Sequence, residues 1–197
     1  IKFTRGKTLM KNDIKKSIKV FEELSKVGFW EWDLVNDTIL ASDKTYEIYG
    51  TSKEIDGAYP NLNVKYGEKD AIKKIEDAIN NLSNNGDYFS ENIHIIKRDT
   101  KEKRIVNIKG KIEIDENGVR TKIKGIVRDI TKYIEQEVKL EIASRNFKVS
   151  FENSPVPMIL QAEDGEFLLM NKACLDLTGY EFEELNSLTK WMGKIHR

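Results

Sequence analysis

Val106-Asn-Ile-Lys-Gly-Lys-Ile-Glu-Ile114 is the stretch that decides the fold, because apolar residues or glycine alternate strictly with polar residues along it. The alternation returns in Lys122-Ile-Lys-Gly-Ile-Val-Arg128. A period of two sends successive side chains to opposite faces, so each segment predicts a half-buried β-strand. Asn117-Gly118 lies between them and is typical of a two-residue hairpin with a type I′ turn. We therefore expect an antiparallel hairpin with one buried face and one solvent-exposed face.

The preceding residues predict three more strands and a set of helices. Phe29-Trp-Glu-Trp-Asp-Leu34 and Thr38–Ala41 have strand composition, and residues 88–98 form a third such segment. Residues 42–60 predict short helices, and residues 68–82 predict a longer helix with one apolar face. This order predicts an α+β domain of about 100 residues, in which a five-stranded antiparallel sheet carries short helices on one face.

Two helices flank this domain. Residues 8–25 place their apolar side chains at helical spacing: Met10, Ile14, Ile18, Phe21 and Leu24. A C-terminal helix is expected from Thr131, as its cap, to about residue 152. Its apolar residues form two stripes, Tyr133, Leu140, Phe147 and Phe151 on one side and Ile134, Val138, Ile142 and Val149 nearly opposite. Two stripes predict contact with both the domain and a partner helix, hence a homodimer; one broad apolar face remains the alternative.

From Phe147 onward the chain repeats its own pattern. Two strands are predicted over residues 158–162 and 166–170, followed by a helix from Asn171. Leu177-Thr-Gly-Tyr180 then parallels Ile48-Tyr-Gly-Thr51, at a spacing of about 130 residues. The second copy has no counterpart of the last three strands before Arg197. We expect the front half of a second domain.

Composition and charge narrow the class of protein. The 33 basic and 33 acidic residues cancel, which gives no long-range field for nucleic acid or an anionic membrane. No apolar run approaches the ~20 residues of a membrane span, and no signal peptide is visible. The single cysteine, Cys174, fits a reducing compartment, so a cytoplasmic location is expected. Because the sequence begins at Ile1, we expect a fragment, and a membrane anchor elsewhere in the parent protein stays open.

These residues carry a resemblance to a known family. The Trp-rich strand 29–34, Tyr46-Glu-Ile-Tyr-Gly50 and Gly125-Ile-Val-Arg-Asp-Ile-Thr131 together resemble a PAS domain with its C-terminal PAC stretch. Asn171-Lys-Ala and Leu177-Thr-Gly-Tyr180 resemble the front half of another. The resulting organisation is an N-terminal helix over 1–26, a PAS/PAC domain over 27–131, a connector helix over 132–150 and a half domain over 151–197. Residues 66–70 and 99–100 depart from the family pattern, at positions where ligand-contacting and loop residues vary.

The resemblance implies a regulatory role. Such domains occur in bacterial diguanylate cyclases and sensor histidine kinases, in cyclic-di-GMP or two-component signalling. They sense a small molecule, redox state or partner, and relay the signal through the connecting helix to a C-terminal output domain. By that resemblance Asp129 and Thr131 form a latch at the start of the helix, and Ile134 and Val138 continue the relay.

An aromatic set is the best candidate for a ligand pocket: Phe29, Trp30, Trp32, Tyr46 and Tyr49. Trp and Tyr combine apolar area with a polar group, which suits recognition of a small molecule, although aromatic residues also fill ordinary cores. Two other functions remain open, a ligand-free dimerisation or spacer module and a small enzyme on a similar curved sheet. No cofactor is expected, and the ligand stays unidentified.

The sequence offers few candidate residues for catalysis or for a metal site. His94 and His196 are the two histidines, too few for a metal site or a Ser-His-Asp triad, and His94 is expected on the outer face of the sheet. Cys174 lies outside the Asn-Cys-Arg-Phe signature of flavin photosensors and is expected to be a small buried apolar residue. We therefore expect no catalysis by this segment.

Overall fold

The structure is a computed structural model that describes residues 16–58, 61–82 and 88–195 of the 197-residue chain. The chain divides into two compact units, Ile1–Tyr133 and Ile134–Arg197. No helix of the described residues is long and apolar enough to cross a membrane.

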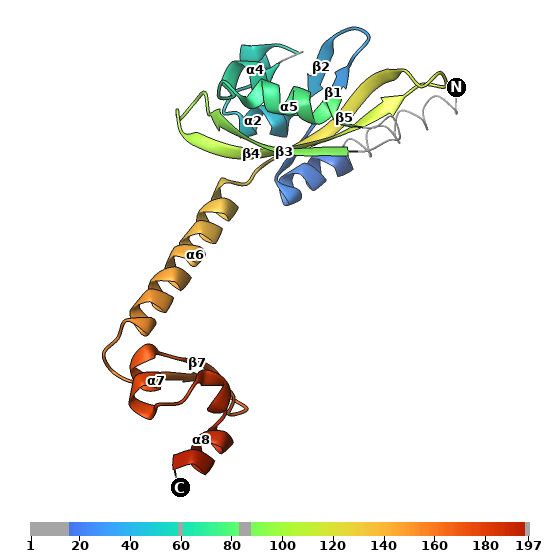
Figure 1. Cartoon of the computed structure of the whole chain (residues 1–197). Helices are drawn as coiled ribbons and strands as arrows, with labels where there is room; N and C mark the ends of the chain where they lie inside the picture. The colour runs from blue at the N-terminus through green and yellow to red at the C-terminus, as the bar shows by residue number, and fades with distance from the viewer. Residues whose placement is uncertain (1–15, 59–60, 83–87, 196–197) are drawn as a thin grey trace. The chain divides into compact units, whose positions relative to one another are not determined.

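The first unit is built on one five-stranded antiparallel sheet (Figure 1). Its strands are β1 (Val27–Asp33), β2 (Thr38–Ala41), β3 (Tyr88–Ile96), β4 (Lys103–Ile114) and β5 (Arg120–Asp129), in the order β2-β1-β5-β4-β3. One face carries α2 (Asp43–Ile48), α3 (Lys53–Asp56), α4 (Leu62–Tyr66) and α5 (Ala71–Asn80). The predicted α+β fold with short helices on one face is confirmed.

The alternating pattern of β4 and β5 sorts the side chains as predicted. Val106, Ile108 and Ile112 are buried on β4, and Ile123 and Val127 are buried on β5. The charged residues between them lie on the opposite face, where Lys122 and Lys124 pair with acidic neighbours. The helices therefore pack onto a continuous apolar surface.

The turn between β4 and β5 differs from the expected type I′ turn, which requires positive φ at both central residues. Only Gly118 has positive φ (78°) there, and the register shifts between Glu113 and Ile114. The Asp115 carboxylate accepts hydrogen bonds from the N–H groups of Asn117 and Val119. This bonding holds Asn117 at negative φ, so the hairpin closes through a longer loop with a bulge.

The N-terminal helix does not bury the face that its periodicity predicts. Residues 16–25 are helical, and Met10 and Ile14 lie outside the described residues. Ile18, Phe21 and Leu24 are all exposed, whereas Glu22 is 7% exposed and its Oε1 has no hydrogen-bond partner among the described residues. Phe21 contacts Phe29 on the face of the sheet away from α2–α5. The helix thus lies on the outer sheet face with a mostly apolar, solvent-facing stripe.

The second unit contains most of α6, a hairpin and three short helical segments. The bounds are α6 (Thr131–Glu152), β6 (Ile159–Gln161), β7 (Phe167–Met170), α7 (Lys172–Thr178), a 3-10 turn (Phe182–Glu184) and α8 (Leu188–Ile195). Its small core is formed by Phe167, Met170, Cys174 and Leu185. The predicted strands and the helix after Asn171 are present.

Hydrogen bonds repeat between the two copies at a spacing of 129 residues. Phe29 N donates to Ser42 Oγ (3.0 Å) in the first copy, and Met158 N donates to Asn171 Oδ1 (2.9 Å) in the second. Ser42 and Asn171 are each the N-cap of the following helix. The internal repeat predicted from sequence landmarks is therefore also a repeat of local hydrogen bonding.

Candidate ligand-binding pocket

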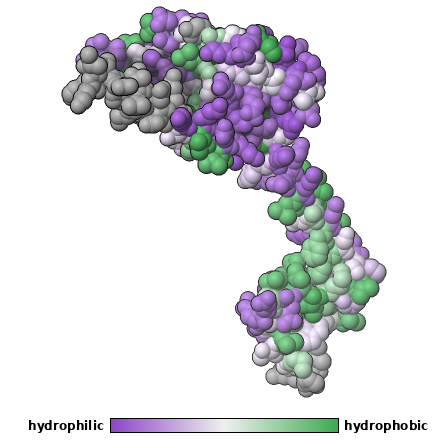
Figure 2. Space-filling view, turned by 180° about the vertical axis from the view of Figure 1, so that it is seen from behind, coloured by the Kyte–Doolittle hydropathy of each residue, from purple (hydrophilic) through white to green (hydrophobic). Residues whose placement is uncertain are grey.

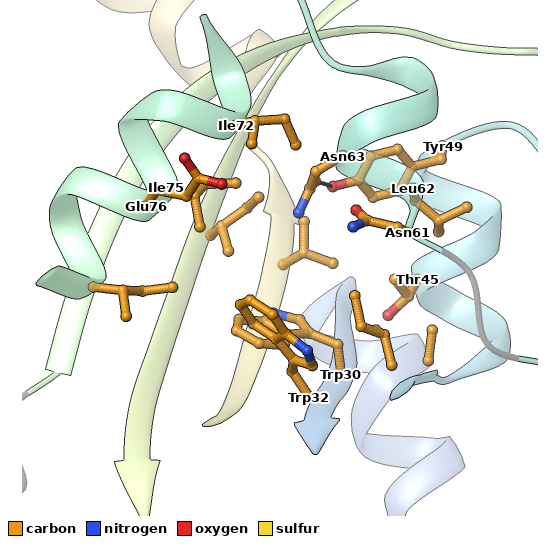
Figure 3. Close-up of a pocket in the computed structure, with 15 residues that line it drawn as sticks. Trp30, Trp32, Thr45, Tyr49, Asn61, Leu62, Asn63, Ile72, Ile75 and Glu76 are labelled. Atoms are coloured by element: carbon orange, nitrogen blue, oxygen red, sulfur yellow. Dashed lines mark hydrogen bonds between the residues drawn. The ribbon is translucent and has the colours of Figure 1, made fainter. Parts of the chain in front are cut away.

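A cavity of about 110 Å³ lies between the inner face of the sheet and helices α2, α4 and α5 (Figure 3). Its walls are mostly apolar, with a few amide and hydroxyl groups. The lining residues are Trp30, Trp32, Ile39, Ala41, Thr45, Tyr49, Asn61, Leu62, Asn63, Ile72, Ile75, Glu76, Ile79, Ile108 and Val127.

Trp30 lies across two glycines that leave room for its indole. In the sheet Trp30 pairs with Gly125, Gly125 with Gly110, and Gly110 with Phe89. A Cβ on either glycine would lie under 3.0 Å from the Trp30 ring, closer than real Cβ atoms approach. The indole also packs against Phe89, with ring centroids 6.2 Å apart. The two glycines, which lie at inner-face positions of β4 and β5, thus leave the space that the Trp30 indole fills.

Three of the five aromatic residues predicted for a pocket line this cavity: Trp30, Trp32 and Tyr49. Phe29 lies elsewhere, because its neighbours in the strand point inward and it faces the outer side, against Phe21. Tyr46 is buried, but its hydroxyl donates to the Gly57 carbonyl (2.6 Å) outside the cavity.

Sequence reasoning missed the polar wall contributed by Asn61 and Asn63. Figure 3 shows their amides directed into the cavity from the start of α4, across from the two indoles. Asn63 Oδ1 accepts a hydrogen bond from the Tyr49 hydroxyl. Burial raises the pKa of that phenol well above its usual range, so Tyr49 stays a neutral donor. No local motif in residues 61–63 distinguishes these amides from ordinary loop asparagines.

Helix α4 is held in place by a buried carboxylate. The side chain of Asp56 is 1% exposed, and it accepts hydrogen bonds from Lys65, from Thr51 Oγ1 (2.6 Å) and from the Tyr66 hydroxyl (2.8 Å). Burial by itself raises the pKa of the Asp56 carboxyl, but these three hydrogen bonds outweigh burial and hold the pKa below its usual range. Because Lys65 and Tyr66 lie on α4, Asp56 fixes the helix that carries the two asparagines.

The lowered pKa of Asp56 predicts a loss of stability in acid. Its folded pKa lies below the unfolded value of about 3.9, so its contribution is fully present above that value and is lost as the pH falls through the folded pKa. Asp56→Asn is expected to lower the free energy of unfolding by about 1–3 kcal/mol at neutral pH. That difference should shrink below about pH 4, measured by urea unfolding at several pH values.

Exposed Asp77 on α5 provides the matched control, since Asp77→Asn should change the free energy of unfolding little at either pH. An Asp56→Asn deficit of equal size at neutral and acid pH would show that the carboxylate charge is not what holds α4.

The residues predicted to relay a signal lie where β5 passes into α6. Asp129 Oδ1 accepts a hydrogen bond from Thr131 N (2.9 Å), so the aspartate binds a backbone group. Thr131 does not cap the helix with its hydroxyl, as its sequence position suggested; Thr131 Oγ1 instead accepts from Ile105 N of β4 (2.8 Å). Ile130 N donates to the Ile105 carbonyl (2.9 Å). The first turn of α6 is therefore bonded to β4 and β5. Ile134 is partly buried and Val138 is exposed further along α6.

The other reactive side chains are separate from the cavity. His94 is exposed on β3, and Cys174 is buried in the second unit, where burial raises the pKa of its thiol. Across residues 16–58, 61–82 and 88–195, no group of three or more His, Cys, Asp or Glu side chains could hold a metal ion.

Comparison with protein families matches both copies. Residues 27–132, more than half of the chain, match a family described as PAS domain, and residues 145–196 match a second PAS domain family. A curated protein, "Hybrid signal transduction histidine kinase I" from Dictyostelium discoideum, is 28% identical over 174 residues. That alignment covers 88% of this chain and 10% of the relative, so the chain spans about a tenth of the relative's length.

Of two solved structures compared with this chain, the first is similar in fold. A crystal structure of a sensory box histidine kinase/response regulator from Burkholderia thailandensis E264 gives a TM-score of 0.53 at 14% identity, covering 66% of this chain and 97% of that one. The N-terminal domain of a diguanylate cyclase with PAS/PAC sensor from Marinobacter aquaeolei gives 0.46 at 11% identity, covering 54% and 97%. At 14% identity, the similarity to the Burkholderia structure shows a shared fold and nothing more.

Proposed function

The chain belongs to the PAS domain family of sensor domains, and on that premise we propose that its first domain binds a small molecule in the cavity and relays the change through α6 to an output domain. The observation that carries this proposal is the cavity itself. Two tryptophans, a tyrosine and two asparagines meet there on a surface that is otherwise mostly apolar, the usual composition of a small-molecule site.

The proposal is tested with the purified chain. Native mass spectrometry should detect a co-purifying small molecule, and a compound library should contain members that raise the unfolding midpoint. Ile75→Phe, which fills the cavity, should abolish both effects while the domain stays folded. Val64→Phe is the matched control, because Val64 is exposed on α4. If no compound stabilises the parent chain, the alternative of a ligand-free spacer takes the place of this proposal.

A short physical route supports the relay. Val127 and Ile108 line the cavity and lie on β5 and β4. Val127 is two residues before Asp129, and Ile108 is three residues after Ile105, whose N–H is bonded to Thr131. A ligand that shifts these strands would change the hydrogen bonds at the first turn of α6, and Ile134 and Val138 would carry the change along the helix. We propose a histidine kinase or diguanylate cyclase as the output domain.

We further propose that α6 pairs with α6 of a second copy. Its apolar residues are spread around the helix instead of forming one face, and Figure 2 shows hydrophobic surface along it. Exposed apolar side chains include Tyr133, Val138, Leu140, Ile142, Phe147 and Val149. Helices with this much uncovered apolar surface usually associate.

The dimer predicts a specific response to charge. Replacing both Ile134 and Val138 with Glu should shift sedimentation towards monomer, because two carboxylates would enter an apolar interface. Gln136→Glu with Ser144→Glu adds the same charge at exposed polar positions of α6 and should leave the association unchanged. Identical monomeric sedimentation of parent and variants would refute pairing through α6.

We propose that this segment has no catalytic activity of its own, works in the cytoplasm and contacts neither nucleic acid nor membrane. Its balanced charge and its buried free thiol at Cys174 support this view.

A further inference from the structure

The geometry points to the chemistry of the ligand: the cavity takes a small, uncharged molecule, about the size of one six-membered ring, through a hydrogen-bond acceptor that faces the indole N–H of Trp30. This inference rests on the proposed function, since it requires that the cavity binds a ligand. It follows from the cavity's size, from the hydrogen bonds its polar groups already make, and from its charge.

Size limits the ligand first. The cavity holds about 110 Å³. An engineered protein cavity of roughly 150 Å³ binds benzene, whereas ligand pockets for larger molecules span about 300–1,000 Å³. The space therefore suits one ring or a molecule of similar volume, and it is too small for a multi-ring cofactor.

The two tryptophans in the wall differ in their hydrogen bonding. Trp32 Nε1 donates to Asp37 Oδ1 at 3.0 Å, so its N–H is already used. Trp30 Nε1 is buried and has no hydrogen-bond partner in the described part of the chain. A buried donor left unpaired is destabilising, and a ligand acceptor would relieve that cost.

The two asparagines add further donors. Asn63 Oδ1 accepts from the Tyr49 hydroxyl, and Asn61 Oδ1 accepts from Val64 N (3.3 Å). Both amide oxygens are thus engaged, while the Nδ2 groups make no hydrogen bond with any described residue. Together with Trp30, the free amide and indole groups of the cavity are all N–H donors. The complementary ligand carries an acceptor, such as a carbonyl, ether or ring nitrogen.

Charge excludes ionic ligands. None of the described residues lining the cavity is Lys, Arg or His, so an anion would be buried without a positive charge beside it. The Thr45 hydroxyl already donates its hydrogen bond to the Phe29 carbonyl (2.8 Å), so it offers no free donor to an anion. Glu76 is the one ionisable carboxylate of the described wall, and it is exposed, so it neutralises a buried cation poorly.

Benzene and pyridine are the probes that test this inference. They have nearly the same shape, but pyridine carries a ring nitrogen that accepts a hydrogen bond. Titration at alkaline pH, where pyridine is uncharged, is followed by the indole N–H resonances in ¹H–¹⁵N spectra. We expect pyridine to move the Trp30 resonance downfield while benzene does not, with the Trp32 resonance little changed by either. In Trp30→Phe, which keeps a ring but removes the N–H, the preference for pyridine over benzene should fall about five-fold. Trp32→Phe should retain that preference.

The possible outcomes distinguish failure of this inference from failure of the proposed function. If benzene and pyridine both bind but neither moves the Trp30 resonance, and Trp30→Phe keeps the preference, the inference fails while the proposed function stands. Tighter binding of pyridinium at acid pH would overturn the assignment of an uncharged ligand. If neither probe perturbs any residue of the cavity, the inference is wrong; the proposed function is then wrong as well only if no compound of the library stabilises the parent chain. The parent chain alone gives the resonance test, so the inference stays falsifiable even if Trp30→Phe does not fold.

Discussion

Replacing Asn171 with aspartate is expected to unfold the second unit and leave the first intact. Asn171 is fully buried, and its Oδ1 accepts hydrogen bonds from Met158 N (2.9 Å) and Cys174 N (3.0 Å). Its Nδ2 donates to the carbonyls of Phe151 (3.1 Å), Ser154 (3.3 Å) and Val156 (2.8 Å). One side chain thus joins the end of α6, the following loop, the start of β6 and the first turn of α7.

Aspartate would keep the two accepted bonds but would direct an oxygen at three carbonyl groups. An ionised carboxylate would be repelled there, and a protonated one could donate only a single hydrogen bond. We expect a loss of about 3–5 kcal/mol, a large share of the stability of so small a unit. The readout is the set of three indole N–H resonances, because Trp191 packs against Phe167 in the second unit while Trp30 and Trp32 belong to the first.

Asn153→Asp is the matched control for this change. Asn153 is exposed and donates to the Val149 carbonyl (2.8 Å), so the same substitution should cost under about 1 kcal/mol. A Trp191 resonance that keeps its folded position in Asn171→Asp would show that the five hydrogen bonds do not hold the unit together.

The sequence predicts the sheet well because the alternation of apolar and polar residues lies within each single strand. Alternation in residues 106–114 and 122–128 follows directly from the two faces of a strand, and it identifies the buried side as observed. The predicted type I′ turn was wrong because the Asp115 carboxylate accepts hydrogen bonds from two N–H groups that follow it in the chain. Such a local hydrogen bond from a side chain to the backbone overrides the preference of Asn-Gly for a type I′ turn.

The N-terminal helix shows why periodicity alone can select the wrong face. Ile18, Phe21 and Leu24 form the apolar stripe, yet Glu22 is the buried residue. Glu22 lies 129 positions before Phe151, which is buried in the second copy. The same helical position is thus buried in both copies, although in the first copy it holds a glutamate and the apolar stripe lies on the surface.

The cavity was predictable only in part, since a pocket depends on contacts between distant segments. Strand parity places Trp30 and Trp32 on the inner face, and the same parity excludes Phe29. Asn61 and Asn63 reach the cavity because α4 is anchored through Asp56, an interaction between residues that no periodic pattern connects.

Gly125→Ala is expected to destabilise the first unit by about 3 kcal/mol and to displace the cavity wall. A Cβ at this position would lie under 3.0 Å from the Lys109 carbonyl oxygen and from the Trp30 ring. The carbonyl belongs to the neighbouring strand and cannot move without breaking the β4–β5 ladder. The Trp30 indole would have to move away from Gly110 and Gly125. Because that indole is part of the cavity wall, the binding of pyridine and of benzene should be lost together. Urea unfolding measures the change in free energy, and the Trp30 indole resonance reports the displacement.

Gly110→Ala separates the two causes of that loss. The three atoms nearest to a Cβ on Gly110 all belong to side-chain rings, those of Phe89 and Trp30, so the expected cost is smaller, about 1–2 kcal/mol. Adding Trp30→Ala should relieve part of the Gly110→Ala cost, and it should relieve less of the Gly125→Ala cost because the Lys109 carbonyl remains. Gly193→Ala on α8, where nothing lies within 4 Å, should instead stabilise the second unit by up to about 1 kcal/mol. Equal costs for Gly125→Ala and Gly110→Ala, or full rescue of both by Trp30→Ala, would show that the indole alone, and not the strand backbone, requires glycine at this row of the sheet.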